Sequence, residues 1–411
     1  MSLDLGSNEP SPTFSRSSDF TKVPGFLRLL RPAIVVFFTI VMAVWILHQP
    51  QQNKWTVDGM VYSTMMLQDA GWTRTAALSM VQHFYESSSR VSQLTEYREL
   101  FGARLPTYFQ ELFPIFAPRL VYPYLSSILY PKFGFMAMTY VSLSAYMLSV
   151  VLFYVLMSSW SPSWLAVLGA LLYGLLPDIR HMATRSATDM LAVLLWILTL
   201  YTIVTYLRRG SDLVLAVYSI ALMVLFLTRP MLYLPVGAVL GACVASWIAG
   251  NSSARDYRRR ATNLALVTVA GCGLYAAVSS ATQPLGLVPT IQFHYNYWLT
   301  HGNHRHLSLE QWYLKAVTQT GAFQLWFLIR TGAIIGWVSL LFALRRSLVL
   351  APVLLGACIF GMVGIAVNPV YTDLPRVVDA PLWPVLLLSL VVVISPLTFQ
   401  RKHLTSRTSE R

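Results

Sequence analysis

The stretch that decides the fold opens with Trp55-Thr56-Val57-Asp58-Gly59-Met60-Val61-Tyr62 and closes with Pro118-Arg119-Leu120-Val121-Tyr122-Pro123. It belongs to a long polar insert, residues 48–119, between an apolar run at 33–48 and another at 135–157. Two apolar runs separated by a long charged insert are typical of two membrane spans joined by a loop outside the hydrocarbon. We expect this insert to carry the polar chemistry of the chain.

The composition of the whole chain agrees with this interpretation. The 411 residues are 55% hydrophobic and 11% charged, with a mean hydropathy of +0.56. A soluble domain carries about 25% charged residues. The net charge of +13 does not indicate nucleic acid, because the basic residues sit in short clusters between apolar runs, where membrane proteins place them. The three cysteines lie inside apolar runs and predict neither a disulfide framework nor a metal site.

About ten apolar runs approach the ~20 residues needed to cross a bilayer, and they predict an all-α polytopic membrane protein. They lie near 33–48, 135–157, 164–176, 190–207, 213–227, 231–249, 261–280, 322–344, 349–367 and 382–397. We expect one membrane domain over residues 33–398, including an external loop at 49–119. Residues 1–32 are expected to form a disordered cytosolic tail, and residues 399–411 a second cytosolic tail.

Short basic clusters set the expected orientation. Four of them lie at 208–209, 255–260, 345–346 and 401–411. With the N-terminus in the cytoplasm, all four fall on the cytoplasmic side, as the positive-inside rule requires. We therefore expect both termini in the cytoplasm and the long loops on the opposite side. Compact loops and the lack of an endoplasmic-reticulum signal favour a bacterial inner membrane.

Asp58 is the candidate catalytic residue. It follows the first span, and its neighbours Trp55 and Tyr62 are typical of the lipid–water boundary. A carboxylate there can take the proton of an acceptor hydroxyl as that hydroxyl attacks a sugar. Asp is also common at helix N-termini, where it caps the backbone. Position alone does not separate these two interpretations.

The order of motifs resembles the GT-C superfamily of integral membrane glycosyltransferases. A first span is followed by Trp55-x-x-Asp58-Gly59-x-x-Tyr62, a long external loop, and Arg119-Leu-Val-Tyr-Pro-Tyr-Leu opening the second span. Thr228-Arg229-Pro230 and Pro375-Arg376 are further points of resemblance.

The resemblance implies transfer of a sugar from a polyprenyl-phosphate donor to a glycan, lipid or protein acceptor at the non-cytoplasmic face. It implies inversion at the sugar and makes Asp58 the general base. Asp58 is followed by Gly59, whereas the commonest members of the superfamily have paired acidic residues here. No cofactor is therefore expected to be required, and a divalent metal remains open but has no support.

Arginines at the external ends of the expected spans are candidates for binding the donor phosphate, because a guanidinium recognises phosphate with two parallel hydrogen bonds. Interfacial anchoring is the competing interpretation for each one. Two acidic residues, Asp178 and Asp189, bracket the second external loop, and we favour helix capping and pairing with arginine for them. The arginine candidates are Arg119, Arg180, Arg185, Arg229 and Arg376, of which Arg119, Arg185, Arg229 and Arg376 are the favoured ones.

Aromatic and histidine side chains are candidates for contact with the acceptor or the sugar. They are Tyr62, Trp298, His301 and His304. The spacing of His301, His304 and His306 is compatible with metal binding. No Cys or carboxylate stands at ligand spacing, so we predict stacking on sugar rings or interfacial anchoring instead.

Two other classes of protein share this layout. A transporter or flippase for lipid-linked sugars would place charges at mid-membrane, on broken helices in paired halves. Here charges avoid mid-membrane apart from Arg330, and no matching halves are visible. An accessory or polymerase subunit of envelope glycan assembly would carry a large catalytic loop late in the chain. The transferase is the favoured hypothesis.

Overall fold

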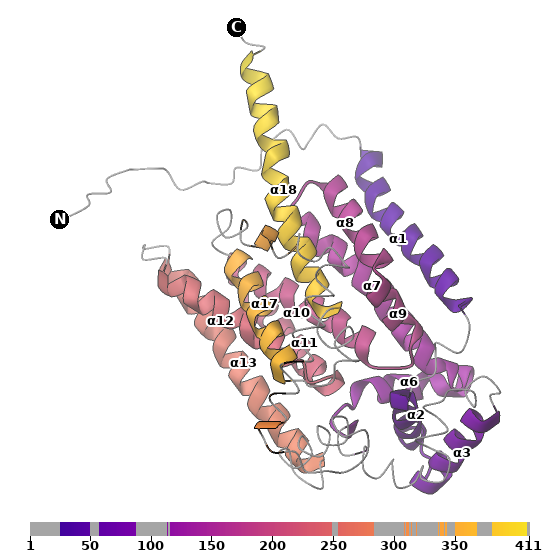
Figure 1. The fold of residues 1–411 in the computed structure, drawn as a ribbon. Helices are drawn as coiled ribbons and strands as arrows, with labels where there is room; N and C mark the ends of the chain where they lie inside the picture. The colour runs from indigo at the N-terminus through magenta and orange to yellow at the C-terminus, as the bar shows by residue number, and fades with distance from the viewer. Residues whose placement is uncertain are drawn as a thin grey trace.

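Apolar helices make up the body of the protein in a computed structural model (Figure 1). The structure describes residues 25–49, 57–87, 116–248, 254–282, 350–367 and 380–408, with isolated positions at 113 and between 308 and 342. These residues form helices and turns and include no strand. The helices are α1 (Gly25–Leu47), α2 (Val57–Asp69), α3 (Arg74–Ser87), α6 (Val121–Phe133), α7 (Met136–Ser158), α8 (Ser163–Leu175), α9 (Pro177–Thr184), α10 (Asp189–Arg209), α11 (Asp212–Thr228), α12 (Tyr233–Ile248), α13 (Ala254–Thr282), α17 (Leu350–Val367) and α18 (Ala380–Thr408).

Within the described part of the chain, four helices are long and apolar enough to cross a membrane, and α8 and α9, which meet at an angle of 57°, make a fifth span if they count as one. The four lie in α1, α7, α10 and α13. Shorter apolar helices occur at Asp212–Thr228, Tyr233–Ile248, Leu350–Gly361 and Pro381–Ser395. The protein is thus an all-α membrane protein, and the count of about ten spans stays a prediction.

The central helix is α10, and α1 lies at the edge. In the 18-residue apolar window of α10, 78% of residues are buried, against 22% in α1. α10 packs against α7 and α11. Its Trp196 indole N–H donates to the carbonyl oxygen of Pro381 (2.9 Å), which ties the start of α18 to the centre of the bundle. The apolar side chains that α1 exposes, including Phe37 and Val41, suit a lipid-facing surface.

The polar insert differs from the expected pattern in two ways. The mixed apolar and polar positions of residues 62–80 can line one face of a helix and predict an amphipathic helix lying on the membrane. Instead, the chain turns at Gly71, whose φ of 94° suits glycine, and two helices result. Every residue from 59 to 67 in α2 is buried, so α2 is enclosed by protein on all sides. Of the two helices α2 and α3, α3 is the amphipathic one, with Ala77, Val81 and Tyr85 buried along one face.

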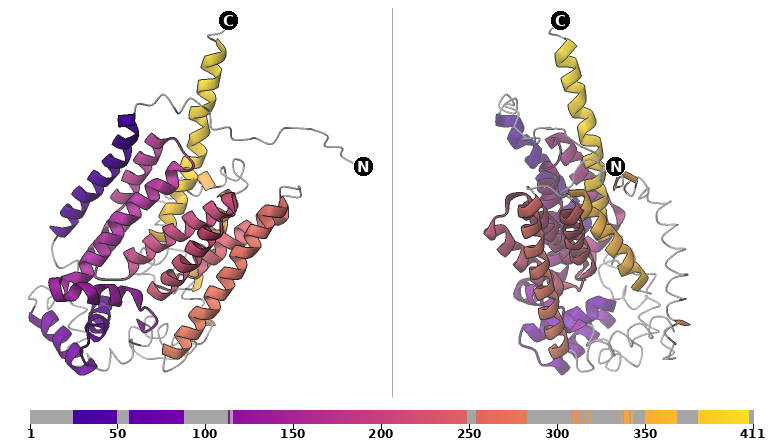
Figure 2. Two further views of the ribbon diagram at one scale, coloured as in Figure 1. Left: turned by 180° about the vertical axis from the view of Figure 1, so that it is seen from behind. Right: turned by 90° about the vertical axis from the view of Figure 1, so that its left-hand side faces the viewer.

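The segment after Arg119 was expected to open the second span, and this expectation is wrong. It forms a separate short helix, α6, which ends at Gly134 before α7 begins. Figures 1 and 2 show α6 lying across the end of the bundle beside α2 and α3. Its Tyr124 and Ile128 are more than half exposed, whereas Tyr122 and Ser126 are buried. An outward apolar face is suited to the membrane interface.

The two ends of the bundle differ in chemistry. The 21 residues of α10 span about 30 Å at 1.5 Å per residue, which equals the thickness of the hydrocarbon. Asp189 lies in the first turn of α10, next to Thr188, whose hydroxyl contacts Tyr62 of α2. Arg208 and Arg209 lie at the other end. There the Arg260 guanidinium donates to the carbonyl oxygens of Leu207 (3.0 Å) and Arg208 (2.9 Å).

Glycines allow α12 and α17 to pack backbone against backbone. A Cβ atom on Gly241 would collide with the carbonyl oxygen of Pro352 and lie 3.3 Å from the Cα of Gly356. Gly237, one turn earlier, faces the Gly356 carbonyl in the same way. This Gly-x-x-x-Gly spacing is a known device for close helix packing in membranes.

We therefore predict that Gly241→Ala lowers the free energy of unfolding by about 1–3 kcal/mol, the usual cost of overpacking. The matched control is Gly273→Ala in α13, where an added Cβ meets no atom within 4 Å. Thermal unfolding of the two proteins in detergent tests this. If Gly241→Ala unfolds at the same temperature as Gly273→Ala, the backbones of α12 and α17 are farther apart than described.

Candidate functional site

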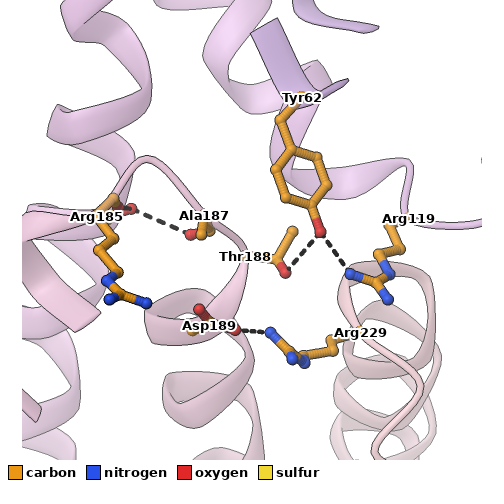
Figure 3. Close-up of polar contacts among 8 residues, drawn as sticks. Tyr62, Arg119, Arg185, Ala187, Thr188, Asp189 and Arg229 are labelled. Atoms are coloured by element: carbon orange, nitrogen blue, oxygen red, sulfur yellow. Dashed lines mark hydrogen bonds and ion pairs between the residues drawn. The ribbon is translucent and has the colours of Figure 1, made fainter. Parts of the chain in front are cut away.

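Tyr62 joins three segments that are far apart in the sequence (Figure 3). An N–H of the Arg119 guanidinium donates to the Tyr62 hydroxyl oxygen at 2.7 Å. The same oxygen lies 3.1 Å from the hydroxyl of Thr188, so the Tyr62 O–H is free to donate to it. Tyr62 has no exposed surface. It therefore positions Arg119, and its expected contact with a sugar stays a prediction.

Aromatic rings fix Arg119 in place. Its guanidinium carbon lies 4.5 Å from the ring centroid of Phe116. The Tyr62 ring packs edge-on against Phe116 and Tyr122, at centroid distances of 5.2 and 5.5 Å. Such contacts favour a cation and restrict its side-chain motion. The Nε atom of Arg119 is buried and has no hydrogen-bond partner among the described residues.

Asp58 lies in the first turn of α2, one helical turn before Tyr62. Residues four apart share a face of a helix, so Asp58 and Tyr62 point to the same side. Burial lowers the pKa of the Arg119 guanidinium, but the Tyr62 oxygen and the Asp58 carboxylate favour its charged form, and the net pKa is raised. Asp58 is only partly buried. The Asp58 carboxylate therefore lies close enough to the Arg119 guanidinium for the two charges to interact.

Arg229 forms an ion pair with Asp189 close to this site (Figure 3). Asp189 has no exposed surface and Arg229 is 8% exposed. The interpretation that Asp189 pairs with an arginine is confirmed. Asp189 also stands in the first turn of α10, where the helix dipole favours a negative charge. The pair joins α10 to the end of α11 and already compensates the charge of Arg229.

The backbone between α9 and α10 is held by a second set of hydrogen bonds. The Ser142 hydroxyl lies 2.9 Å from the carbonyl oxygen of Arg185 and 3.3 Å from that of Ala187. The Tyr122 hydroxyl donates to the carbonyl oxygen of Met138 (2.9 Å) and lies 3.1 Å from Ser142. In the view of Figure 3, the partly exposed Arg185 side chain extends toward Asp189 from the side opposite Arg229.

Four predicted site residues lie outside the described part of the chain. They are Arg376, Trp298, His301 and His304. Among the residues that are described, no group of three or more His, Cys, Asp or Glu side chains is placed to hold a metal ion.

A separate pair of charged residues lies on α9. The Asp178 carboxylate accepts a hydrogen bond from the Trp383 indole N–H at 3.1 Å. The guanidinium carbon of Arg180 lies 5.3 Å from the ring centroid of Trp45 on α1. These contacts connect α9 to α18 and to α1.

Sequence reasoning found Asp58, Tyr62, Arg119 and Arg229 but missed how they are connected. The helical spacing of Asp58 and Tyr62 could have been read directly. Nothing in the sequence marks Thr188 as the partner of a residue 126 positions earlier. These contacts arise from the packing of α2 and α6 over the end of α10.

No model of a known protein family matches the chain, and neither a curated protein nor a solved structure is similar to it at a significant level.

The buried ion pair generates a prediction about stability. Asp189→Asn leaves the buried Arg229 charge uncompensated and should lower the free energy of unfolding by about 3–5 kcal/mol. The double variant Asp189→Asn with Arg229→Gln removes both charges and should be more stable than Asp189→Asn alone. Thermal unfolding of the two variants and of Arg229→Gln checks this, and purely additive losses would contradict the pairing.

Proposed function

We propose that this protein is a membrane glycosyltransferase that moves a sugar from a polyprenyl-phosphate donor to a hydroxyl group of an acceptor. The observation that carries the proposal is that Asp58 and Arg119 lie at the same end of the apolar bundle, close enough for the Asp58 carboxylate to favour the charged form of Arg119. One supplies a partly exposed carboxylate, and the other a fixed cation whose Nε–H has no partner among the described residues. The resemblance to the GT-C superfamily supports the same assignment.

The chemistry follows from these two groups. Asp58 accepts the proton of the acceptor hydroxyl while that oxygen attacks the anomeric carbon. The bond between the anomeric carbon and the phosphate oxygen breaks, and polyprenyl phosphate leaves with the electron pair. Arg119 balances the charge that develops on the phosphate. A single displacement of this kind inverts the configuration of the sugar.

Arg119 is the strongest of the predicted phosphate-binding residues. Tyr62 and Phe116 hold its guanidinium before any ligand binds, so little conformational freedom is lost on binding. Arg229 is already paired with Asp189, which makes it a positioning residue in this proposal. Arg185 and Arg376 remain proposed secondary contacts.

The surroundings of Arg119 suit a donor carried by a lipid. Arg119 immediately precedes α6, whose apolar side chains Tyr124 and Ile128 face outward. A prenyl chain in the bilayer can lie along this face while its phosphate reaches Arg119 at the lipid–water boundary. We further propose about ten spans, with both termini cytoplasmic and the site at the opposite face of a bacterial inner membrane.

Asp58→Asn should lower the rate of sugar transfer at least about 100-fold, because the variant keeps the shape of the side chain but cannot accept the proton. The matched control is Asp69→Asn, which removes a carboxylate from the other end of α2. The assay measures labelled sugar transferred from a panel of polyprenyl-phosphate sugars by purified protein in lipid. Equal activity of the two variants would remove Asp58 from the mechanism.

Arg119→Gln should raise the KM for the donor about tenfold or more, because the guanidinium is proposed to contact the phosphate throughout the reaction. Arg119→Lys keeps the charge but loses the planar donor pair, and should recover only part of the affinity. Arg74→Gln, at the exposed start of α3, is the control for loss of a cation. A donor KM that is the same in all three variants would contradict phosphate binding by Arg119.

A transporter or flippase for lipid-linked sugars is the second candidate. One observation favours it: the 57° bend between α8 and α9, with Asp178 and Arg180 just after the break. Broken helices that carry charged residues form substrate sites in transporters. Movement of a lipid-linked sugar between leaflets of sealed vesicles, with no transfer to any acceptor, would favour this candidate.

A further inference from the structure

The end of the bundle opposite Tyr62 holds a recess between α7 and α10. The recess is small, with a volume of about 30 Å³, and its mouth is open to solvent. Leu156 and Val204 form its apolar floor, and both are almost completely buried. The polar part of its wall consists of Ser159, Trp160, Tyr201, Thr205, Arg208 and Arg209.

The polar wall of the recess is ordered along α10. Tyr201, Thr205 and Arg208 follow one another at helical spacing, so they form one strip from the apolar floor to the helix end. The Arg208 guanidinium carbon lies 4.8 Å from the ring centroid of Trp160, and one N–H donates to the carbonyl oxygen of Ser159 at 3.4 Å. A Trp beside an Arg at the end of a span is typical of the membrane interface.

The arginines of the recess carry charge that no described carboxylate pairs with. Neither Arg208 nor Arg209 forms an ion pair with a described carboxylate. The acidic residues in the first turns of α11 and α13, Asp212 and Asp256, stand at helix N-termini, where the helix dipole favours them. Arg260 already satisfies the last carbonyl groups of α10, so Arg208 and Arg209 are not needed for that purpose.

We propose that this recess binds the headgroup of an anionic phospholipid. The phosphate is held by Arg208 and Arg209 at the mouth of the recess, Tyr201 and Thr205 supply hydroxyl donors, and the acyl chains extend from the mouth into the hydrocarbon. Basic pockets between membrane helices bind such headgroups in this manner. The site lies about 30 Å from Asp189, one hydrocarbon thickness away, and is independent of the proposed transfer reaction.

Native mass spectrometry of the full-length protein, titrated with phosphatidylglycerol or phosphatidylcholine, tests the proposal. Arg208→Gln with Arg209→Gln should weaken binding of phosphatidylglycerol about tenfold or more and leave phosphatidylcholine unchanged. The matched control is Arg258→Gln with Arg259→Gln, which removes two exposed charges from the same end of the bundle but outside the recess. The control should bind phosphatidylglycerol within about twofold of wild type.

Equal weakening in the two double variants would overturn the proposal, because it would show diffuse attraction to the basic end. Inorganic phosphate in excess should not displace the bound lipid, since it lacks the acyl chains. Displacement by inorganic phosphate would show an ion site and would also overturn the assignment to a lipid. Thermal unfolding of both double variants in zwitterionic detergent, with midpoints equal to each other, excludes a folding defect as the cause of a difference.

Discussion

Burial of charged side chains at one end of an apolar bundle is the constraint on which the rest of the structure depends. A guanidinium enclosed by protein must have partners, because an uncompensated charge there is costly. Arg229 is compensated by Asp189. Arg119 is held by a neutral hydroxyl and an aromatic ring, and its Nε–H has no partner among the described residues. The first arrangement balances the buried charge within the protein, and the second is the one that we propose to bind an anionic ligand.

The same constraint explains why the polar insert folds back onto the bundle. Residues 59–67 of α2 are buried around the whole circumference of the helix. In this position, Tyr62 reaches both Arg119 and Thr188. α6 closes the end of the bundle with a polar inner face and an apolar outer face. At the other end of the bundle the charged side chains are not buried, since Arg208 and Arg209 are exposed. The two ends therefore suit two different partners.

Apolar runs predicted the main helices well, because a span must satisfy its backbone internally and only a helix does so within one segment. Asp58 and Arg119 could be singled out because a charged residue next to a span is conspicuous. The break at Gly71 and the separation of α6 from α7 depend on backbone conformations that periodicity does not reveal. The link from Tyr62 to Thr188 arises from packing and could not be predicted. Pairing of Asp189 with an arginine was predicted, but the sequence does not identify Arg229 as its partner.

The most direct test of the central claim is sugar transfer by vesicles in which the orientation of the protein is known. Ser87→Cys and Arg258→Cys mark the two ends for a membrane-impermeant thiol reagent, since both positions are exposed. A labelled polyprenyl-phosphate sugar and an impermeant acceptor are then supplied from outside. The account predicts transfer only when the end that carries Ser87 faces the acceptor. Transfer only when the end that carries Arg258 faces the acceptor would contradict it.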